Sequence, residues 1–80
     1  MNDVDRYRLF LRTIGSFIKE DAFRTRKDAE DSSDSDRLFH RGKLQGYYAV
    51  ISTLQQQAKP LGIPLEELLL DDIEPDRDLT

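Results

Sequence analysis

The chain contains no cysteine, and this absence excludes several kinds of protein at once. Without cysteine there is no disulfide framework, thiolate zinc site, iron–sulfur cluster or cysteine nucleophile. No apolar run approaches the roughly 20 residues needed to span a bilayer. The first residues, MNDVDRYR, lack the basic and then apolar order of a secretory signal. We therefore expect a soluble, reduced, cytoplasmic protein that makes no membrane contact and carries no cofactor.

Histidine is nearly absent as well, and the potential catalytic and metal-binding groups are incomplete. The only histidine, His40, follows Asp36 by four residues, a spacing that orients an imidazole, but no serine or threonine is evidently placed as its nucleophile. Acidic residues at 30, 31, 34 and 36 supply oxygen ligands without the glycine and final glutamate of a calcium loop. We expect His40 to be a surface or interface residue and the protein to be neither an enzyme nor a metal binder.

The 80 residues allow one small domain, which excludes a large catalytic scaffold such as a doubly wound sheet or an eight-stranded barrel. Charge is unevenly distributed along it, because residues 66–80 contain seven acids and one base, while the net charge of the whole chain is −4. We expect a single helical domain over 1–73 and a flexible acidic tail over 74–80. The tail is interpreted either as a solvated, solubilising segment or as an arm that contacts a basic partner or covers the protein's own basic face.

Apolar residues recur with the period of an α-helix in two long segments. In the first segment, from about 3 to 30, apolar residues at spacings of three and four are Val4, Tyr7, Leu11, Ile14 and Ile18, with Phe10 and Phe17 beside them. The polar sequence DSSDSD then predicts a break and a helix start at one of the serines 33–35. Whether DSSDSD also serves as a modified regulatory site is left open.

The second helix is predicted from about 36 to 59, with apolar residues on one face at Leu44, Tyr47, Ile51 and Leu54. Pro60 ends it, because proline lacks the backbone donor and clashes with the preceding turn. Pro64 suits the first turn of a short third helix, from about 64 to 71. Leu65, Leu68 and Leu69 would form the apolar face of this helix.

The short connection predicts an all-α, antiparallel helical hairpin in which facing residue numbers sum to about 68. This register places Ile14 against Leu54, Phe17 against Ile51 and Ile18 against Val50. Small side chains allow close approach of helix axes, and the residues predicted to pack closely in this way are Gly15, Ala22, Gly42 and Gly46.

Two helices cannot bury all of this apolar surface, so a second copy or another protein is expected to cover the rest. We predict a homodimeric helical bundle and a non-catalytic function in protein binding, as a small adaptor, regulator or inhibitor. The predicted partner-binding residues are Phe39, Tyr47, Tyr48, Ile51, Leu65, Leu68 and Leu69.

Basic residues on both sides of the predicted turn give an alternative function, contact with nucleic acid by an accessory protein. They are Arg24, Arg26, Lys27, Arg37, Arg41 and Lys43. Five acids lie among them, which favours a network of surface ion pairs instead.

Overall fold

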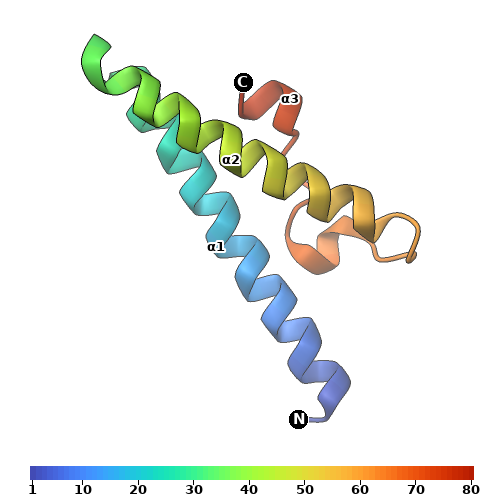
Figure 1. Cartoon of the computed structure of the whole chain (residues 1–80). Helices are drawn as coiled ribbons and strands as arrows, with labels where there is room; N and C mark the ends of the chain where they lie inside the picture. The colour runs from blue at the N-terminus through green and yellow to red at the C-terminus, as the bar shows by residue number, and fades with distance from the viewer.

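The computed structural model describes residues 1–80 and is helical throughout, without strands (Figure 1). Two long helices, α1 (Asp3–Asp31) and α2 (Asp34–Ala58), form a hairpin. A single turn of 3-10 helix, η1 (Leu65–Leu68), and a short helix, α3 (Pro75–Asp78), follow. The all-α hairpin predicted from periodicity is therefore confirmed, and both long helices begin and end within two residues of their predicted bounds.

Local side-chain bonds fix where the two long helices begin. The side-chain oxygen of Asn2 accepts a hydrogen bond of 2.8 Å from the backbone N–H of Asp5 and so caps α1. Ser33 is the cap residue of α2, but its hydroxyl contacts the carboxylate of Asp36 at 3.3 Å instead of a backbone N–H. The helix therefore begins at one of the predicted serines, but without a side-chain bond to a backbone N–H.

The third predicted helix, over 64–71, is reduced to the single turn of η1. Leu69 adopts a left-handed conformation with φ of 54° and ends the turn. Its carbonyl oxygen accepts a hydrogen bond of 2.7 Å from the ammonium group of Lys19 on α1. The amide of Gln55 on α2 donates to the carbonyl oxygens of Leu70 (3.1 Å) and Ile73 (2.9 Å). Side chains of the hairpin thus satisfy carbonyls that a longer helix would have bonded internally.

Residues 74–80, expected to form a flexible tail, are instead packed against the hairpin. Leu79 is 2% exposed and belongs to the same core cluster as Ile51 and Leu70. The carboxylate of Asp76 bonds to the hydroxyl of Tyr48, and Asp78 is buried with several partners. Because these acids are bonded to groups of the chain, their charge does not keep the segment in solvent. The packed domain therefore extends to the C-terminal residues.

The small residues predicted to mediate close helix packing divide into two groups. Gly15 and Ala22 of α1 are buried, and a β-carbon on Gly15 would overlap the carbonyl oxygen of Leu68 in η1. Gly42 and Gly46 of α2 are exposed, with no atom within 4 Å of the position of a β-carbon. The prediction for these two glycines is wrong because the side of α2 on which they lie faces solvent.

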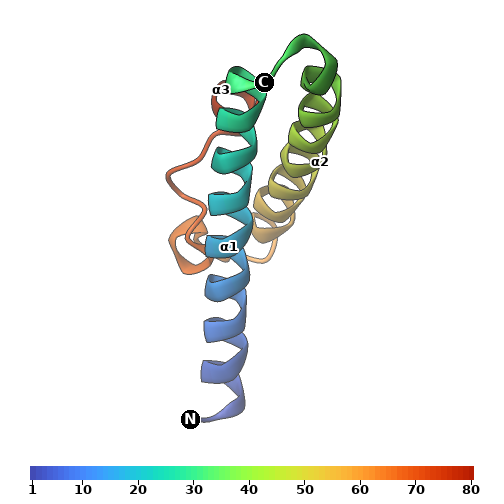
Figure 2. The same ribbon diagram turned by 90° about the vertical axis from the view of Figure 1, so that its left-hand side faces the viewer.

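The two long helices are close at the turn and diverge from it, so the first half of α1 projects beyond the rest of the molecule (Figures 1 and 2). Phe17 and Val50, which the predicted register placed between the two helices, are both exposed in this arrangement. The molecule measures 49 × 25 × 16 Å, and its radius of gyration is 14.2 Å. A compact domain of this length would have a radius of about 11.6 Å.

Candidate interaction surface

Most residues predicted to bind a partner are covered by the chain itself. Ile51 and Leu68 are buried core residues, which corrects their inclusion among the partner-binding residues. Tyr47, Tyr48, Leu65 and Leu69 are half-buried, and all but Leu69 pack against the core. Phe39 alone is freely exposed, with Lys43 above its ring at 5.9 Å and His40 against its edge.

Tyr48 is half-buried, and its hydroxyl is bonded within the chain. Its hydroxyl donates a hydrogen bond to the carboxylate of Asp76 in α3. This bond to the carboxylate raises the pKa of Tyr48 above its ordinary value. Tyr48 therefore serves to hold α3 on α2, which the sequence could not indicate because the two residues are 28 positions apart.

The apolar surface that remains uncovered lies on the first half of α1. Four side chains at spacings of three, four and three residues share one side of the helix. These are Tyr7 (69% exposed), Phe10 (61%), Ile14 (36%) and Phe17 (60%), which we call the apolar stripe. Sequence periodicity placed Tyr7 and Ile14 on a helix face and Phe10 and Phe17 beside it, but assigned that face to contact with the second helix.

Two groups of residues flank the apolar stripe on the helix surface. At 100° per residue, Val4, Leu11 and Ile18 lie between the stripe and the body of the molecule. Arg6, Thr13 and Glu20 lie on the other flank, which faces solvent. Leu9 is equally exposed but lies about 120° around the helix from the centre of the stripe.

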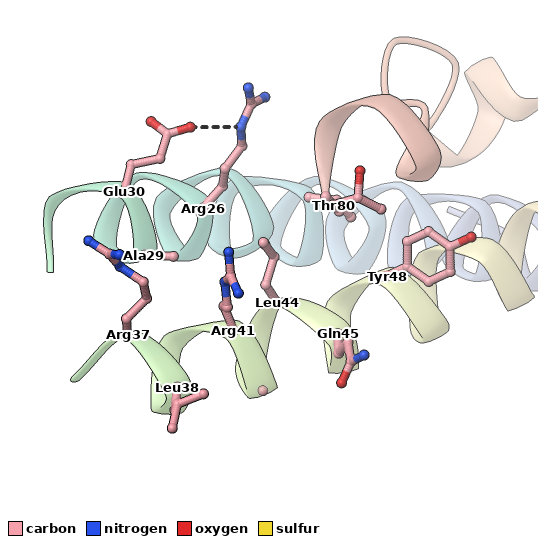
Figure 3. Close-up of a pocket in the computed structure, with 12 residues that line it drawn as sticks. Arg26, Ala29, Glu30, Arg37, Leu38, Arg41, Leu44, Gln45, Tyr48 and Thr80 are labelled. Carbon is pink, nitrogen blue, oxygen red and sulfur yellow. Dashed lines mark hydrogen bonds and ion pairs between the residues drawn. The ribbon is translucent and has the colours of Figure 1, made fainter. Parts of the chain in front are cut away.

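The six basic residues of the alternative prediction, nucleic-acid contact, are only partly brought together. Arg26, Arg37 and Arg41 line a groove of about 750 Å³ at the closed end of the hairpin, whereas Arg24, Lys27 and Lys43 lie outside it. Figure 3 shows Arg37 and Arg41 extending from α2 towards α1, and Arg26 bonded to Glu30 at 3.3 Å. The floor is apolar and includes Leu44 and Leu79.

Ion pairs neutralise several of these cations, as one reading of the sequence expected. Arg24 pairs with Asp21 at 3.1 Å, and Arg37 pairs with Asp34 at 3.5 Å. Arg41 is the one groove arginine without an ion pair. The groove therefore offers a single uncommitted cation next to apolar surface.

The most strongly bonded carboxylate belongs to Asp78 and has a structural role. It accepts hydrogen bonds from the guanidinium of Arg77 (2.9 Å) and from the backbone N–H of Glu74 (2.8 Å). These bonds, together with Arg26 at 3.9 Å, lower the pKa of Asp78 to about 2. A second pair, between Lys19 and Asp72 at 2.7 Å, lowers the pKa of Asp72. Both carboxylates stabilise the C-terminal segment.

The remaining features are a nitrogen of His40, the acidic side chains and the hydropathy of the long helices. The Nδ1 atom of His40 is buried without a hydrogen-bond partner. No three histidine, aspartate or glutamate side chains are grouped so as to hold a metal ion. Neither long helix combines the length and the hydropathy that crossing a membrane requires.

Comparisons with known proteins identify no relative of this chain. No protein-family model, curated protein or solved structure matches the chain. The residues and geometry of this chain are therefore the basis for its function.

Proposed function

We propose that the protein is a non-catalytic protein-binding module and that its binding element is the first half of α1. The observation that carries this proposal is the excess surface of the chain. Its accessible surface is 5862 Å², whereas a compact monomer of its mass exposes about 5,000 Å². The excess, about 900 Å², is close to the ~800 Å² that each partner contributes to a standard protein interface.

The chemistry of the uncovered surface supports the same function. The apolar stripe contains three aromatic residues, Tyr7, Phe10 and Phe17, and aromatic residues are enriched at protein interfaces. A contiguous exposed apolar face on a small protein typically marks an interaction site. The class of function predicted from the sequence is thus retained, while the proposed surface moves from α2 and η1 to α1.

The proposed mechanism is packing of one helix face against an apolar face of the partner. Residues at i, i+3, i+7 and i+10 provide the anchors, and the charged flank with Arg6 and Glu20 provides the selectivity. The partner gains the burial of aromatic side chains, and the module is not required to change its fold, since α1 is already helical over the whole stripe.

Site-specific photo-crosslinking tests this proposal. A benzophenone amino acid replaces Phe10 or, as a matched control, the neighbouring exposed Leu9 in cells that produce the protein. We expect discrete covalent adducts from position 10 and none from position 9, because only position 10 lies in the stripe. A lack of adducts from position 10 would contradict the proposed function.

The groove at the closed end of the hairpin favours a second candidate function, binding of a single-stranded nucleic acid through Arg37 and Arg41. Its affinity would fall steeply as salt rises, because phosphate contacts release counterions. Arg41→Gln should weaken the binding of an oligonucleotide, whereas Lys59→Gln, an exposed position outside the groove, should not. Absence of binding at low salt would remove this candidate.

A further inference from the structure

We infer that the partner of the apolar stripe is a second copy of this chain, paired antiparallel through the first halves of the two α1 helices. This inference rests on the proposed function, because it names the occupant of the same surface. Three independent features of the stripe support it: the symmetry of its spacing, the charges on its outer flank and the position of the rest of the molecule.

The spacing of the stripe is symmetric about residue 12. In an antiparallel pair with its two-fold axis at that level, Tyr7 of one copy meets Phe17 of the other. Phe10 of one copy meets Ile14 of the other, and the axis repeats both contacts. The two-fold axis thereby buries four layers of apolar side chains, all of which are exposed in the single chain.

The charges on the outer flank favour the same orientation. Arg6 and Glu20 are both exposed, and neither forms an ion pair within its own chain. In the antiparallel register, Arg6 of each copy lies beside Glu20 of the other, and Thr13 faces its own counterpart on the axis. A parallel pair would instead set this charged flank of each copy beside the apolar flank of the other, which leaves Arg6 and Glu20 without an opposite charge.

The inner flank is apolar and completes the seam. Val4 of one copy lies beside Ile18 of the other, and the two Leu11 side chains meet near the axis. Like charges meet only at the ends, where Asp3 faces Asp21. At that end Arg24 of the same chain binds Asp21 at 3.1 Å, which reduces the repulsion.

The projection of α1 leaves space for this arrangement (Figure 2). α2 packs against the second half of α1, where Ala22 and Thr25 are buried, and residues 1–14 are exposed. In an antiparallel pair the two bodies therefore lie at opposite ends of the seam. The excess of about 900 Å² on each chain is enough for an interface of standard size.

Cysteine cross-linking tests the register, because the natural chain contains no cysteine. With a short bismaleimide, Thr13→Cys should give a covalent dimer, and a mixture of Arg6→Cys and Glu20→Cys chains should give a mixed dimer. Arg12→Cys, on the side of α1 opposite the apolar stripe, should remain monomeric. All four positions are exposed, so the fold is retained, and circular dichroism checks that it is. A dimer from Arg6→Cys alone would indicate parallel pairing and overturn the inference.

Charge reversal tests the flank contact. Arg6→Glu should weaken self-association by up to about 25-fold, since the two-fold axis repeats the loss of a surface ion pair that is worth up to about fivefold in affinity. The swap Arg6→Glu with Glu20→Arg should restore it. Arg12→Glu, the same change on the opposite side of α1, should leave the self-affinity as it is in the natural chain. Failure of the swap to restore association would contradict the register.

Failure of this inference is distinguishable from failure of the proposed function. A chain that stays monomeric at millimolar concentration in sedimentation overturns self-pairing. If position 10 still forms photo-adducts of another mass in cells, the stripe binds a different protein and the proposed function stands. If position 10 forms no adducts, both fail. Adducts of twice the chain mass, together with the Thr13→Cys dimer, support both.

Discussion

The carbonyl oxygen of Leu68 occupies the space that a β-carbon on Gly15 would fill. This contact seats η1 directly on the backbone of α1, and it explains a glycine in the middle of a 29-residue helix. Interior glycine costs a helix about 1 kcal/mol relative to alanine, and the close approach of a buried segment offsets that cost. The same contact leaves the apolar stripe, on another side of α1, without cover.

Alanine substitutions at two glycines should therefore have opposite effects on stability. Gly15→Ala should lower the free energy of unfolding by about 1–3 kcal/mol, because backbone of η1 must move away. Gly46→Ala, where no atom lies within 4 Å, should raise it by about 0.5–1 kcal/mol through helix propensity. Urea unfolding measures both, and a stabilising Gly15→Ala would show that η1 does not rest on α1.

The packing of the C-terminal segment makes a prediction that a flexible tail would not. Leu79→Ala should cost about 2–5 kcal/mol, as expected for a leucine removed from a core. Leu61→Ala is the matched control, because Leu61 is an exposed leucine and its truncation should change stability by less than about 0.5 kcal/mol. Equal, small effects for the two variants would mean that residues 74–80 do not pack.

Acid should destabilise the fold through Asp78. Its pKa is about 2 in the folded chain against an ordinary value of 3.8, so the unfolded state binds a proton at higher pH than the folded state. The contribution of Asp78 is complete above about pH 5 and is lost as pH falls from there towards 2. Unfolding free energies measured from pH 6 to pH 2 should fall less steeply for Asp78→Asn; an unchanged slope would contradict the bonded state of this carboxylate.

The bonds from Gln55 to the C-terminal segment should be visible in stability as well. Gln55→Glu removes the amide donor to Leu70 and Ile73 and brings a negative charge to their carbonyl oxygens. We expect a loss of about 1–3 kcal/mol. The neighbouring Gln56→Glu, at an exposed position, makes the same change of charge and should be close to neutral. Similar losses for the two variants would argue against these bonds.

Local patterns in the sequence were sufficient to predict the two long helices. Periodic apolar residues, the polar DSSDSD segment and Pro60 act within a few residues, and the observed helix bounds follow them closely. The C-terminal segment was predicted poorly because its conformation depends on distant partners. Lys19 bonds to Leu69 across 50 positions, and no local pattern indicates that bond. The charge of residues 66–80 suggested solvent exposure, but ion pairs and hydrogen bonds hold several of those acids on the hairpin.

The sequence predicts that some apolar surface stays uncovered within the chain, but it does not predict where that surface lies. Helical periodicity showed that more apolar residues exist than a hairpin can cover, and the surface area supports that conclusion. Periodicity does not show which part of a long helix finds cover within the chain. Tyr47 and Ile51 are covered by packing within the chain, whereas Phe10 and Phe17 are left exposed by the divergence of the helices.

The most direct test of the account is the molar mass in solution by light scattering, across a concentration series, for the natural chain, Phe10→Glu and Leu9→Glu. Both substitutions replace an exposed apolar side chain by glutamate at neighbouring positions, and only Phe10 lies in the apolar stripe. We expect the natural chain and Leu9→Glu to rise to twice 9.3 kDa, while Phe10→Glu stays at the monomer mass. A natural chain that remains at 9.3 kDa throughout, or a Phe10→Glu variant that still dimerises, would contradict the account.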